Sequence, residues 1–536
     1  MWPRAAPRIF GRPLAGDATV IHRSPYPDLE IPDVPFHEIV LGRARALRDK
    51  PALIDGPTGR VLTYGQLAAG VERVAAGLAA RGFAKGDVLA IFAPNSPEFA
   101  VAYLGASAAG GIITTLSPLA TRDDVARQLR HARARFLITV PSFLDRAVTA
   151  ADQAGVEEIF VFGDAPGATP FDALADSPGR APAIAFDPAE DLVALPYSSG
   201  TTGLNKGVML THRNLVANVL QAAAIVQIGE DDRAIALMPF FHIYGMVVVM
   251  GMHLAQGATL VTMPRFEMDA FLALLQSHRI THTCVAPPVV VALAKHPALG
   301  DLDLRHLRAL FSGAAPMDAA LQRECAERLG CEVLQGYGMT EASPVTHGTW
   351  ADPGKCRPGT VGEIAPNTEC RLVDPATGKD CAPGEAGEIW VRGPQVMKGY
   401  LDDPAATAST LDADGWLHTG DIAVVDADGY FTIVDRLKEL IKVKAYQVPP
   451  AELEALLLTH PAVADAAVIG IPDVEAGEVP KAFVVLKGDA TAQALMDFVA
   501  GRVAPYKRVR SVEFIDAIPK SPSGKILRRV LKDRRP

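Results

Sequence analysis

The stretch from Ser198 to Gly207, SSGTTGLNKG, holds the residue types that bind polyphosphate. It contains three glycines, two serines, two threonines and one lysine. Such a loop lets backbone N–H groups and hydroxyls converge on phosphate oxygens, and the lysine adds a compact positive charge. A glycine-rich hairpin turn without a function is the alternative interpretation, which the paired hydroxyls and Lys206 disfavour.

This loop does not fit the Walker A sequence, G-x-x-x-x-G-K-[ST]. Counted from Gly200, Asn205 stands where the second glycine should be, and Gly207 stands where serine or threonine should follow the lysine. We therefore expect a different kind of phosphate loop, and not a phosphoryl-transfer enzyme of the Walker A class.

Further segments place charged residues among glycines and hydroxyl groups. They are GYGMTEASP (336–344), GWLHTGDIAVVDADGYFTIVDRLKELIK (415–442) and PKSPSGKILRR (519–529). Taken singly, Glu341 or Asp421 could be a surface carboxylate, Tyr337 a core residue and Lys525 a solvated lysine. These segments and the phosphate loop form an ordered set of motifs along the chain, and such a set does not arise by chance.

Together these segments resemble the adenylate-forming superfamily, which includes acyl-CoA synthetases, luciferases and the adenylation domains of peptide synthetases. Within it, PFFHIYG, SGAAP, GYGMTEASPV and DRLKELIK are most similar to the 4-coumarate–CoA ligase group, and the resemblance covers nearly the whole chain. It implies that a carboxylate attacks the α-phosphorus of ATP to give acyl-AMP and pyrophosphate, and that coenzyme A then displaces AMP. The first step needs stabilisation of negative charge more than acid–base catalysis, because an anion attacks a polyanion.

The resemblance implies an ATP site in the larger part of the chain. Glu341 would bind Mg²⁺, which prefers hard oxygen ligands, and Thr340 would contact the α-phosphate. Asp421 and Arg436 would hold the ribose hydroxyls, and Tyr337 would stack on adenine. The other ATP- or AMP-binding residues that the resemblance implies are Ser198, Ser199, Gly200, Thr201, Thr202, Lys206, Gly313, Ala314, Ala315, Gln335, Gly336 and Lys438.

The resemblance also makes Lys525 the lysine that bridges the attacking carboxylate and the α-phosphate. A cation at that point acts most strongly in the transition state, where negative charge accumulates. The small C-terminal domain must then close over the large one, rotating about a hinge at Lys438 between the two steps. The other residues implied are Lys442 and Gln447 beside the nucleotide, and Arg265, Lys444 and Ala445 beside coenzyme A.

The acyl pocket is expected between FFHIYGMVVV and GYGMTEASPV, with His242 as a gate before the carboxylate. Glycines on one wall and an aromatic side chain on the other suit a flat ring, so we expect an aromatic acid of the hydroxycinnamate or cinnamate type. No clear polar partner for a ring hydroxyl is visible, and a medium-chain fatty acid is the alternative. The residues that match the family's acyl slot are Tyr244, Val248, Phe311, Gly338, Pro344 and Val345, with Ala314 and Gly336 shared with the nucleotide site.

The chain departs from the resemblance at Asn205, Pro449 and Ala445. Asn205 stands where proline is usual and tolerates turn dihedrals, and Pro449 precedes a helix where alanine is common. Ala445 stands where the relatives have glycine, on the path of the pantetheine arm, and its methyl group could slow thioester formation. An acyl-adenylating enzyme with an acceptor other than coenzyme A therefore stays open. A non-catalytic nucleotide-binding homologue is disfavoured because the charged site residues are all present.

Alternating helix and strand patterns must position these groups. Thr63 and Gln66 form a capping-box signature at the start of a helix with apolar residues on one face. DVLAIFAP, GIITTL and RFLITV predict strands, and SPEFAVAYLGASAAGG and RDDVARQLRHARA predict the helices between them. This order predicts a parallel sheet with helices on its faces.

After about residue 350, short strands with turn signals follow, as in AGEIWVRGPQVMKGY. The expected fold class is α/β: a large N-terminal domain of parallel-type α/β layers plus a β-rich subdomain, with a small mobile α+β C-terminal domain. The predicted domains are residues 1–436 and 437–536, with the hinge near Lys438. The basic end, KILRRVLKDRRP, is predicted to be a solvated helical end.

Composition restricts the partners. A chain of 536 residues exceeds one hydrophobic core, and a net charge of −9 disfavours nucleic acid as the main partner. Scattered cysteines and an N-terminus without an apolar leader indicate reduced thiols and a cytoplasmic location. Polar residues interrupt GMVVVMGMHLAQGATLVTM, so we predict a buried helix and strand there and not a membrane span. The expected small molecules are the acid, ATP, Mg²⁺ and coenzyme A, and the expected protein is a monomer or homodimer.

Overall fold

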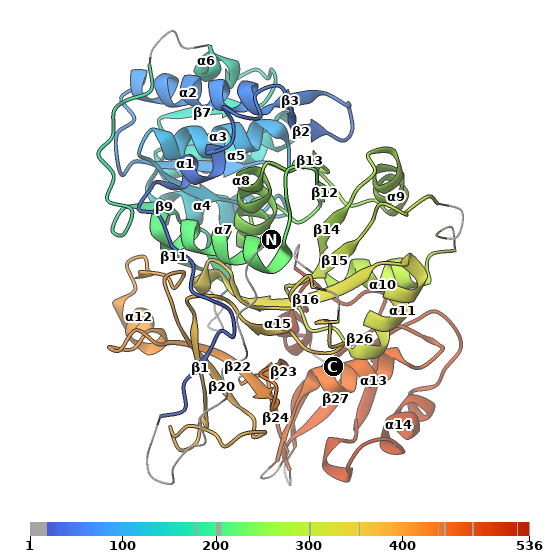
Figure 1. Ribbon diagram of the computed structural model, residues 1–536. Helices are drawn as coiled ribbons and strands as arrows, with labels where there is room; N and C mark the ends of the chain where they lie inside the picture. The colour runs from blue at the N-terminus through green and yellow to red at the C-terminus, as the bar shows by residue number, and fades with distance from the viewer. Residues whose placement is uncertain are drawn as a thin grey trace.

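The computed structural model describes residues 19–176, 180–199, 205–297, 299, 302–352, 354–437, 439–443, 446–473, 476–521 and 524–534. In Figure 1 the larger part of the chain runs from blue to yellow at the top, and the C-terminal part, orange to red, lies at the bottom right. No helix among these residues is both long and apolar enough to cross a membrane.

A mostly parallel sheet near the N-terminus confirms the predicted alternation of strands and helices. Its strands are β4 (Val88–Phe92), β5 (Ile112–Thr115), β6 (Ala134–Thr139), β7 (Glu158–Val161), β8 (Thr169–Pro170), β9 (Leu192–Ala194), β10 (Tyr197–Ser199), β11 (Asn205–Thr211) and β21 (Gly399–Tyr400). They follow the order β10-β11-β9-β5-β4-β6-β7-β8, with β21 beside β11. β5, β4, β6 and β7 are parallel, whereas β10 and β11 form an antiparallel hairpin at one edge.

The helices on this sheet begin where the sequence predicts. Thr63 and Gln66 form the expected capping box at α2 (Tyr64–Ala80), and Ser96 caps α3 (Pro97–Ala108), which has proline in its first turn. The other helices of this region are α1 (Phe36–Leu41), α4 (Arg122–Ala132), α5 (Leu144–Ala154), α6 (Asp172–Ala175) and α7 (His212–Val226).

Two further sheets complete the α/β layers. One has the order β12-β13-β2-β3, and the other has the order β14-β15-β16-β17-β18. Their bounds are β2 (Pro51–Asp55), β3 (Val61–Thr63), β12 (Arg233–Ala236), β13 (Thr259–Thr262), β14 (His282–Val285), β15 (Ala309–Ser312), β16 (Glu332–Gly338), β17 (Val345–Gly348) and β18 (Glu363–Ile364). The helices beside them are α9 (Met268–Ser277), α10 (Pro287–Lys295) and α11 (Ala319–Leu329).

The apolar run after His242 forms a buried helix followed by a strand, as predicted, but most of the helix is of the π type. The π-helical segment η2 (Tyr244–Met252) leads into α8 (His253–Gln256), and Gly257 ends that helix with a positive φ before β13. π-helical turns are rare and occur often at functional sites.

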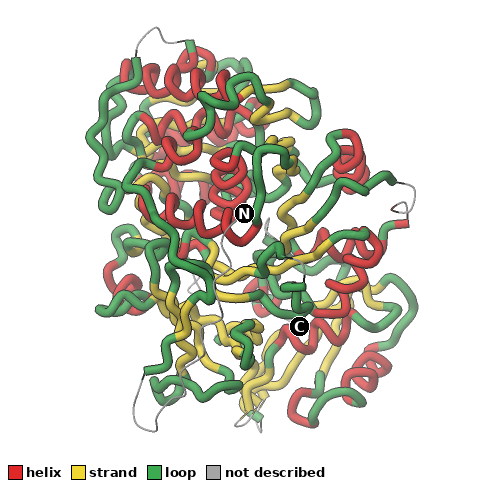
Figure 2. Tube along the Cα trace, in the orientation of Figure 1, coloured by secondary structure: helices red, strands yellow, loops and turns green. Residues whose placement is uncertain are grey.

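An antiparallel sheet with the order β1-β19-β20-β22-β23 confirms the short strands predicted after residue 350. Figure 2 shows these strands in yellow at the lower left. The bounds are β1 (His22–Arg23), β19 (Glu369–Val373), β20 (Gly387–Arg392), β22 (Leu417–Val425) and β23 (Phe431–Arg436), with α12 (Pro404–Thr410) nearby.

The C-terminal part has its own sheet, with the order β25-β24-β27-β26 and β28 beside β27. The elements are β24 (Ile441–Val443), β25 (Tyr446–Val448), α13 (Pro450–Leu458), β26 (Val463–Asp473), β27 (Gly477–Leu486), α14 (Ala492–Ala500), β28 (Ser511–Phe514) and α15 (Arg528–Lys532). The observed architecture is therefore the predicted mixture of α/β layers, a β-rich region and a small α+β region. The division at residues 436 and 437 remains a prediction.

The prediction of a solvated basic end is wrong for part of α15. The Arg528 side chain is only 12% exposed, and Leu531 is buried. Two carboxylates, on Glu439 and Glu454, form ion pairs with Arg528. This pair of carboxylates, one buried on Glu454 and one partly buried on Glu439, explains why a cation leaves the solvent here.

Candidate active site

The predicted phosphate loop lies on the β10–β11 hairpin. Ser198 and Lys206 are opposite each other across the two strands. The Ser198 hydroxyl donates to Glu341 Oε1 at 2.8 Å, so the hairpin contacts the predicted Mg²⁺ carboxylate directly. Gly200, Thr201 and Thr202 lie outside the described residues, as does the Ser199 side chain.

Glu341 lies in a short 3₁₀ turn (Thr340–Ala342) after β16 and is 6% exposed. Its Oε1 atom accepts a second hydrogen bond, of 2.9 Å, from the Tyr400 hydroxyl. The Tyr400 ring also lies 4.8 Å from the Lys206 ammonium, an arrangement typical of a cation–π contact. Sequence reasoning missed Tyr400, because only the pairing of β21 with β11 brings this residue to the site.

Asp421, Arg436 and Tyr337 form the predicted nucleoside-binding group. Asp421 and Arg436 face each other on β22 and β23, and their side chains form an ion pair of 3.1 Å. The Tyr337 hydroxyl, from β16, donates to the other carboxylate oxygen of Asp421 at 2.7 Å. A buried carboxylate held on both oxygens keeps a fixed orientation, which suits recognition of a ribose diol.

The predicted adenine wall combines the loop after β15 with the end of β16. Ala314 adopts a positive φ of 73° beside Gly313. The side-chain amide of Gln335 is already used within the protein, because Nε2 donates to Met317 O and to Gln322 Oε1. A contact between Gln335 and the nucleotide would therefore come from its backbone. A Cβ atom on Gly338 would collide with the Pro344 carbonyl, so the protein's own backbone requires this glycine.

Lys525, near the C-terminal end of the chain, lies within electrostatic reach of the carboxylates of Asp421 and Glu341. Its backbone N–H donates to Ser521 Oγ at 3.1 Å, and a Cβ atom on the adjacent Gly524 would lie 3.1 Å from Pro288 of α10. Burial lowers the pKa of Lys525 to about 8, and the positive charge of Arg436 adds to this effect. Carboxylates on Glu439, Asp421 and Glu341 act in the opposite direction.

His242 lies close enough to Lys525 to be affected by its charge. Burial, together with the charge of Lys525, lowers the pKa of His242 to about 4, so its imidazole is neutral at pH 7. A cavity of about 70 Å³ lies here. Its lining residues are Thr115, Ser117, Gln128, Pro196, Tyr197, Asn205, Phe241, His242, Ile243 and Thr340.

Among the residues predicted for the acyl pocket, Tyr244 and Phe311 are in direct contact. The Tyr244 hydroxyl donates to the Phe311 carbonyl at 2.9 Å, and a Cβ atom on Gly313 would lie 3.4 Å from the Tyr244 ring. Val248 on η2 and Phe311 on β15 are both buried hydrocarbon side chains. Asn218 Nδ2 donates to the Val345 carbonyl, which fixes the chain after Pro344.

The remaining predicted residues are Lys442 and Gln447 beside the nucleotide, Lys438 at the hinge, and those beside coenzyme A. Lys442 and Arg265 are exposed, and among the described residues no hydrogen bond or ion pair joins either side chain to the groups above. Lys442 lies opposite Gln447 on the β24–β25 hairpin, but the Gln447 side chain is not described. Lys438, Lys444 and Ala445 lie outside the described residues. These roles stay predictions.

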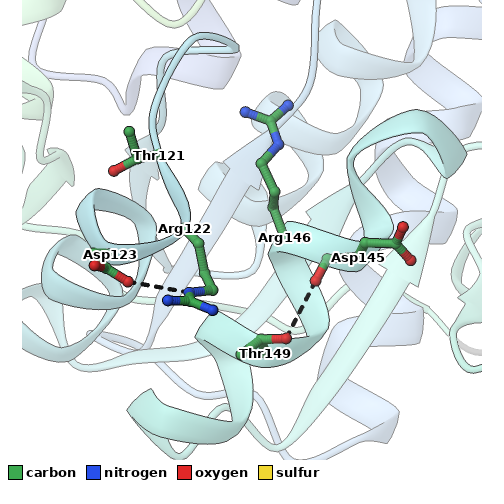
Figure 3. A pocket seen from close by; sticks show the side chains of 6 residues that line it. All are labelled: Thr121, Arg122, Asp123, Asp145, Arg146 and Thr149. Carbon is green, nitrogen blue, oxygen red and sulfur yellow. Dashed lines mark hydrogen bonds and ion pairs between the residues drawn. The ribbon is translucent and has the colours of Figure 1, made fainter.

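The chain also has a larger depression, of about 410 Å³, away from this site (Figure 3). Thr121, Arg122, Asp123, Asp145, Arg146 and Thr149 line it, at the starts of α4 and α5. Arg122 pairs with its neighbour Asp123, and Thr149 donates to the Asp145 carbonyl. None of the predicted site residues lies there, so cavity size alone would misplace the active site.

Comparison with known proteins agrees with this geometry. The AMP-binding enzyme family matches residues 42–401, and the AMP-binding enzyme C-terminal domain matches residues 452–525. The 4-coumarate–CoA ligase 5 of Oryza sativa subsp. japonica is 45% identical, over 96% of this chain and 97% of that protein.

Solved structures of related ligases are also similar to this chain. The anthranilate CoA ligase AuaEII in complex with anthranoyl-AMP has a TM-score of 0.87 and 28% identity, over 94% of this chain and 97% of that one. The amide bond synthetase McbA from Marinactinospora thermotolerans has a TM-score of 0.82 and 30% identity, over 92% of this chain and 99% of that one. With these two matches covering most of its length, this chain belongs to the AMP-binding enzyme family.

Proposed function

We propose that this protein is an AMP-forming acid–CoA ligase of the 4-coumarate–CoA ligase type. It converts an aromatic carboxylate, ATP and coenzyme A into an acyl-CoA thioester, AMP and pyrophosphate through an acyl-AMP intermediate. One observation supports this more than any other: Lys525 lies within electrostatic reach of Asp421, Arg436 and Glu341, although it comes from the far end of the chain. The similarity to plant 4-coumarate–CoA ligases along nearly the full length supports the choice of acceptor and acid.

In the first step, the acid's carboxylate attacks the α-phosphorus and pyrophosphate leaves. Lys525 stabilises the negative charge that accumulates around that phosphorus, and Thr340 contacts the same phosphate. Ser198 and Lys206 hold the departing phosphates, while Asp421 and Arg436 fix the ribose. This arrangement lowers the barrier by preorganised charge and positioning, without a general base.

Glu341 fits the role of a Mg²⁺ ligand. It is a buried carboxylate whose Oε1 atom is held by two hydroxyl groups, and Mg²⁺ typically takes one or two protein carboxylates together with substrate phosphates. When bound, Mg²⁺ would neutralise phosphate charge next to the hairpin.

The acyl slot favours a flat ring. Gly313 lets the backbone lie close to the Tyr244 ring, since a Cβ atom there would be 3.4 Å from it, and Val248 and Phe311 offer further hydrocarbon surface for the predicted slot. The Tyr244 hydroxyl donates to the Phe311 carbonyl and also interacts with the Cys284 thiol, so it has no free hydrogen for a ring hydroxyl. Cinnamate-type acids with or without a 4-hydroxyl group are therefore the proposed substrates, and medium-chain fatty acids are the alternative.

The second step is proposed to follow rotation of the C-terminal domain about Lys438. Ala445, in place of glycine, keeps open an acceptor other than coenzyme A, and the structural similarity to an amide bond synthetase favours testing an amine. A cytoplasmic location and a monomeric or homodimeric state are further proposals that rest on the sequence.

The test is a panel of cinnamic, 4-coumaric, benzoic and octanoic acids, scored for AMP and pyrophosphate with no acceptor, with coenzyme A and with a simple amine. We expect the cinnamate-type acids to give AMP and thioester only with ATP and coenzyme A. Turnover with an amine but not with coenzyme A would refute coenzyme A as the acceptor. Faster turnover of octanoate than of the cinnamate-type acids would refute the proposed acid. Formation of ADP instead of AMP would refute the mechanism as a whole.

A further inference from the structure

Asp435 is a buried carboxylate that the proposed mechanism does not use. It precedes Arg436 near the end of β23, and it is 5% exposed. Its Oδ1 atom accepts from the backbone N–H of Arg436 at 2.7 Å, and its Oδ2 atom accepts from the backbone N–H of Ala451 at 3.0 Å. Asp435 lies before the predicted hinge residue, Lys438, and Ala451 lies after it.

Ala451 belongs to the first turn of α13 (Pro450–Leu458), a helix that lacks a cap of its own. The first N–H groups of a helix have no partner within it and are usually satisfied by a side chain at the N-cap position. Pro449 occupies that position and makes no side-chain hydrogen bond, and Pro450 has no N–H to donate. The N–H of Ala451 is therefore the first one that needs a partner, and Asp435 supplies it from the other side of the hinge.

The same helix is joined to the loop that carries Lys525. Glu454 on α13 accepts two hydrogen bonds of 2.7 Å from Arg528, which follows Lys525 by three residues. Glu454 also accepts from the backbone N–H of Val468, and Arg528 forms an ion pair with Glu439 just after the hinge. A displacement of α13 is thus transmitted to the lysine through buried charged contacts.

We propose that Asp435 is a positioning residue that caps α13 across the hinge and thereby favours the pose in which Lys525 lies in the nucleotide site. This inference rests on the proposed function, because it assumes two half-reactions in two poses. Rotation about Lys438 separates residues on opposite sides of it, so the cap exists in one pose and is lost in the other. The internal contacts of Arg528, Glu454 and Glu439 move together as one unit.

The cap changes the balance between poses and not the chemistry itself. Loss of a helix cap shifts a conformational equilibrium by about tenfold. Asp435→Ala should therefore slow acyl-AMP formation by up to about tenfold. The same variant should convert added acyl-AMP and coenzyme A to thioester at an unchanged or higher rate. Asp435→Asn keeps an amide oxygen that can accept from Ala451 and should retain most of the adenylation rate.

Both half-reactions can be measured on the full-length enzyme in single-turnover experiments. Adenylation is followed as pyrophosphate release from cinnamate and ATP without coenzyme A, and thioesterification is followed with synthetic cinnamoyl-AMP. Matched controls remove caps that do not cross the hinge. Asp318 caps α11 through Ala320 and Leu321, and Thr491 caps α14 through Ala494. Asp318→Ala and Thr491→Ala should lower Tm without changing the ratio of the two rates.

The inference is supported if Asp435→Ala lowers the ratio of the adenylation rate to the thioesterification rate, if Asp435→Asn restores this ratio, and if the control variants leave it unchanged. An equal loss in both half-reactions would overturn it, because a fold defect or a disturbed Arg436 acts on both. An unchanged ratio, or the same change in the controls, would overturn it too. If the parent enzyme forms acyl-AMP and only the ratio test fails, this inference falls and the proposed function stands. If the parent forms no acyl-AMP from any acid, the proposed function itself falls.

Discussion

Raising the pH should switch off the first half-reaction through a single lysine. Burial and the neighbouring Arg436 lower the pKa of Lys525 to about 8, from 10.5 for a free lysine. If the ammonium form of Lys525 stabilises the transition state, adenylation must decline as this group loses its proton. The decline should begin near neutral pH, where an ordinary lysine would still be fully charged.

The size of the effect follows from the titration. With a pKa of about 8 in the free enzyme, the charged fraction of Lys525 is about 0.9 at pH 7 and about 0.1 at pH 9. The value of kcat/KM for adenylation, which reports the free enzyme, should therefore fall about tenfold between these two pH values. An unshifted lysine would lose less than about 5% of its charge over the same range.

The assay is pyrophosphate release from cinnamate and ATP, with saturating Mg²⁺ and without coenzyme A, from pH 6 to pH 10. Lys525→Arg is the informative variant, because a guanidinium keeps its charge over this whole range. Its activity should be lower, since the shape of the cation differs, but its alkaline decline should disappear.

Two results would refute this reasoning. A parent enzyme whose kcat/KM stays level to pH 9.5 would show that Lys525 keeps its proton or has no role in the step. An alkaline decline of the same midpoint in Lys525→Arg would assign the titration to another group.

Three further predictions concern the same site. Tyr400→Phe removes one hydrogen bond to a charged carboxylate, worth about 1.5–3 kcal/mol, and should lower kcat/KM for adenylation at least tenfold while raising the Mg²⁺ concentration for half-maximal rate; an unchanged Mg²⁺ titration would contradict this. Ala445→Gly should speed thioester formation in single turnover and leave adenylation unchanged, and equal thioester rates would show that the methyl group does not obstruct the arm. Lys525→Met should be more stable than the parent at pH 7, by up to about 3 kcal/mol, because burial disfavours the charged lysine. Since the folded pKa lies below the unfolded one, this difference in the free energy of unfolding should shrink as the pH rises from about 8 to 10.5, and denaturant titrations at several pH values would show whether it does.

Local signals in the sequence predicted the frame of the molecule well. The capping box at Thr63 and the alternation of strand and helix patterns depend on neighbouring residues, and the structure confirms both. The type of helix at η2 could not be predicted in this way. In an almost continuously apolar run, hydrophobic periodicity cannot distinguish an α-helix from a π-helix.

The site features that the sequence did not predict depend on contacts between residues far apart in the chain. Tyr400 contacts Glu341 across 59 residues, and no spacing rule links a short KGY segment to a distant carboxylate. Arg528 looks solvated within its basic run, yet its partners Glu439 and Glu454 lie 89 and 74 residues earlier. Resemblance to known motifs located the charged residues of the site, and only the folded chain revealed which side chains hold them in place.

The π-helical turns of η2 give the enzyme a particular route to new substrates. Each such turn contains one residue more than the corresponding α-helical turn. Deleting one residue between Tyr244 and Met252 would let one of these turns rewind as an α-helical turn, which changes the side chains that this turn presents and keeps the orientation of those beyond it. The loss of a single codon could thus change which side chains of η2 face the predicted acyl slot, with every remaining residue unaltered.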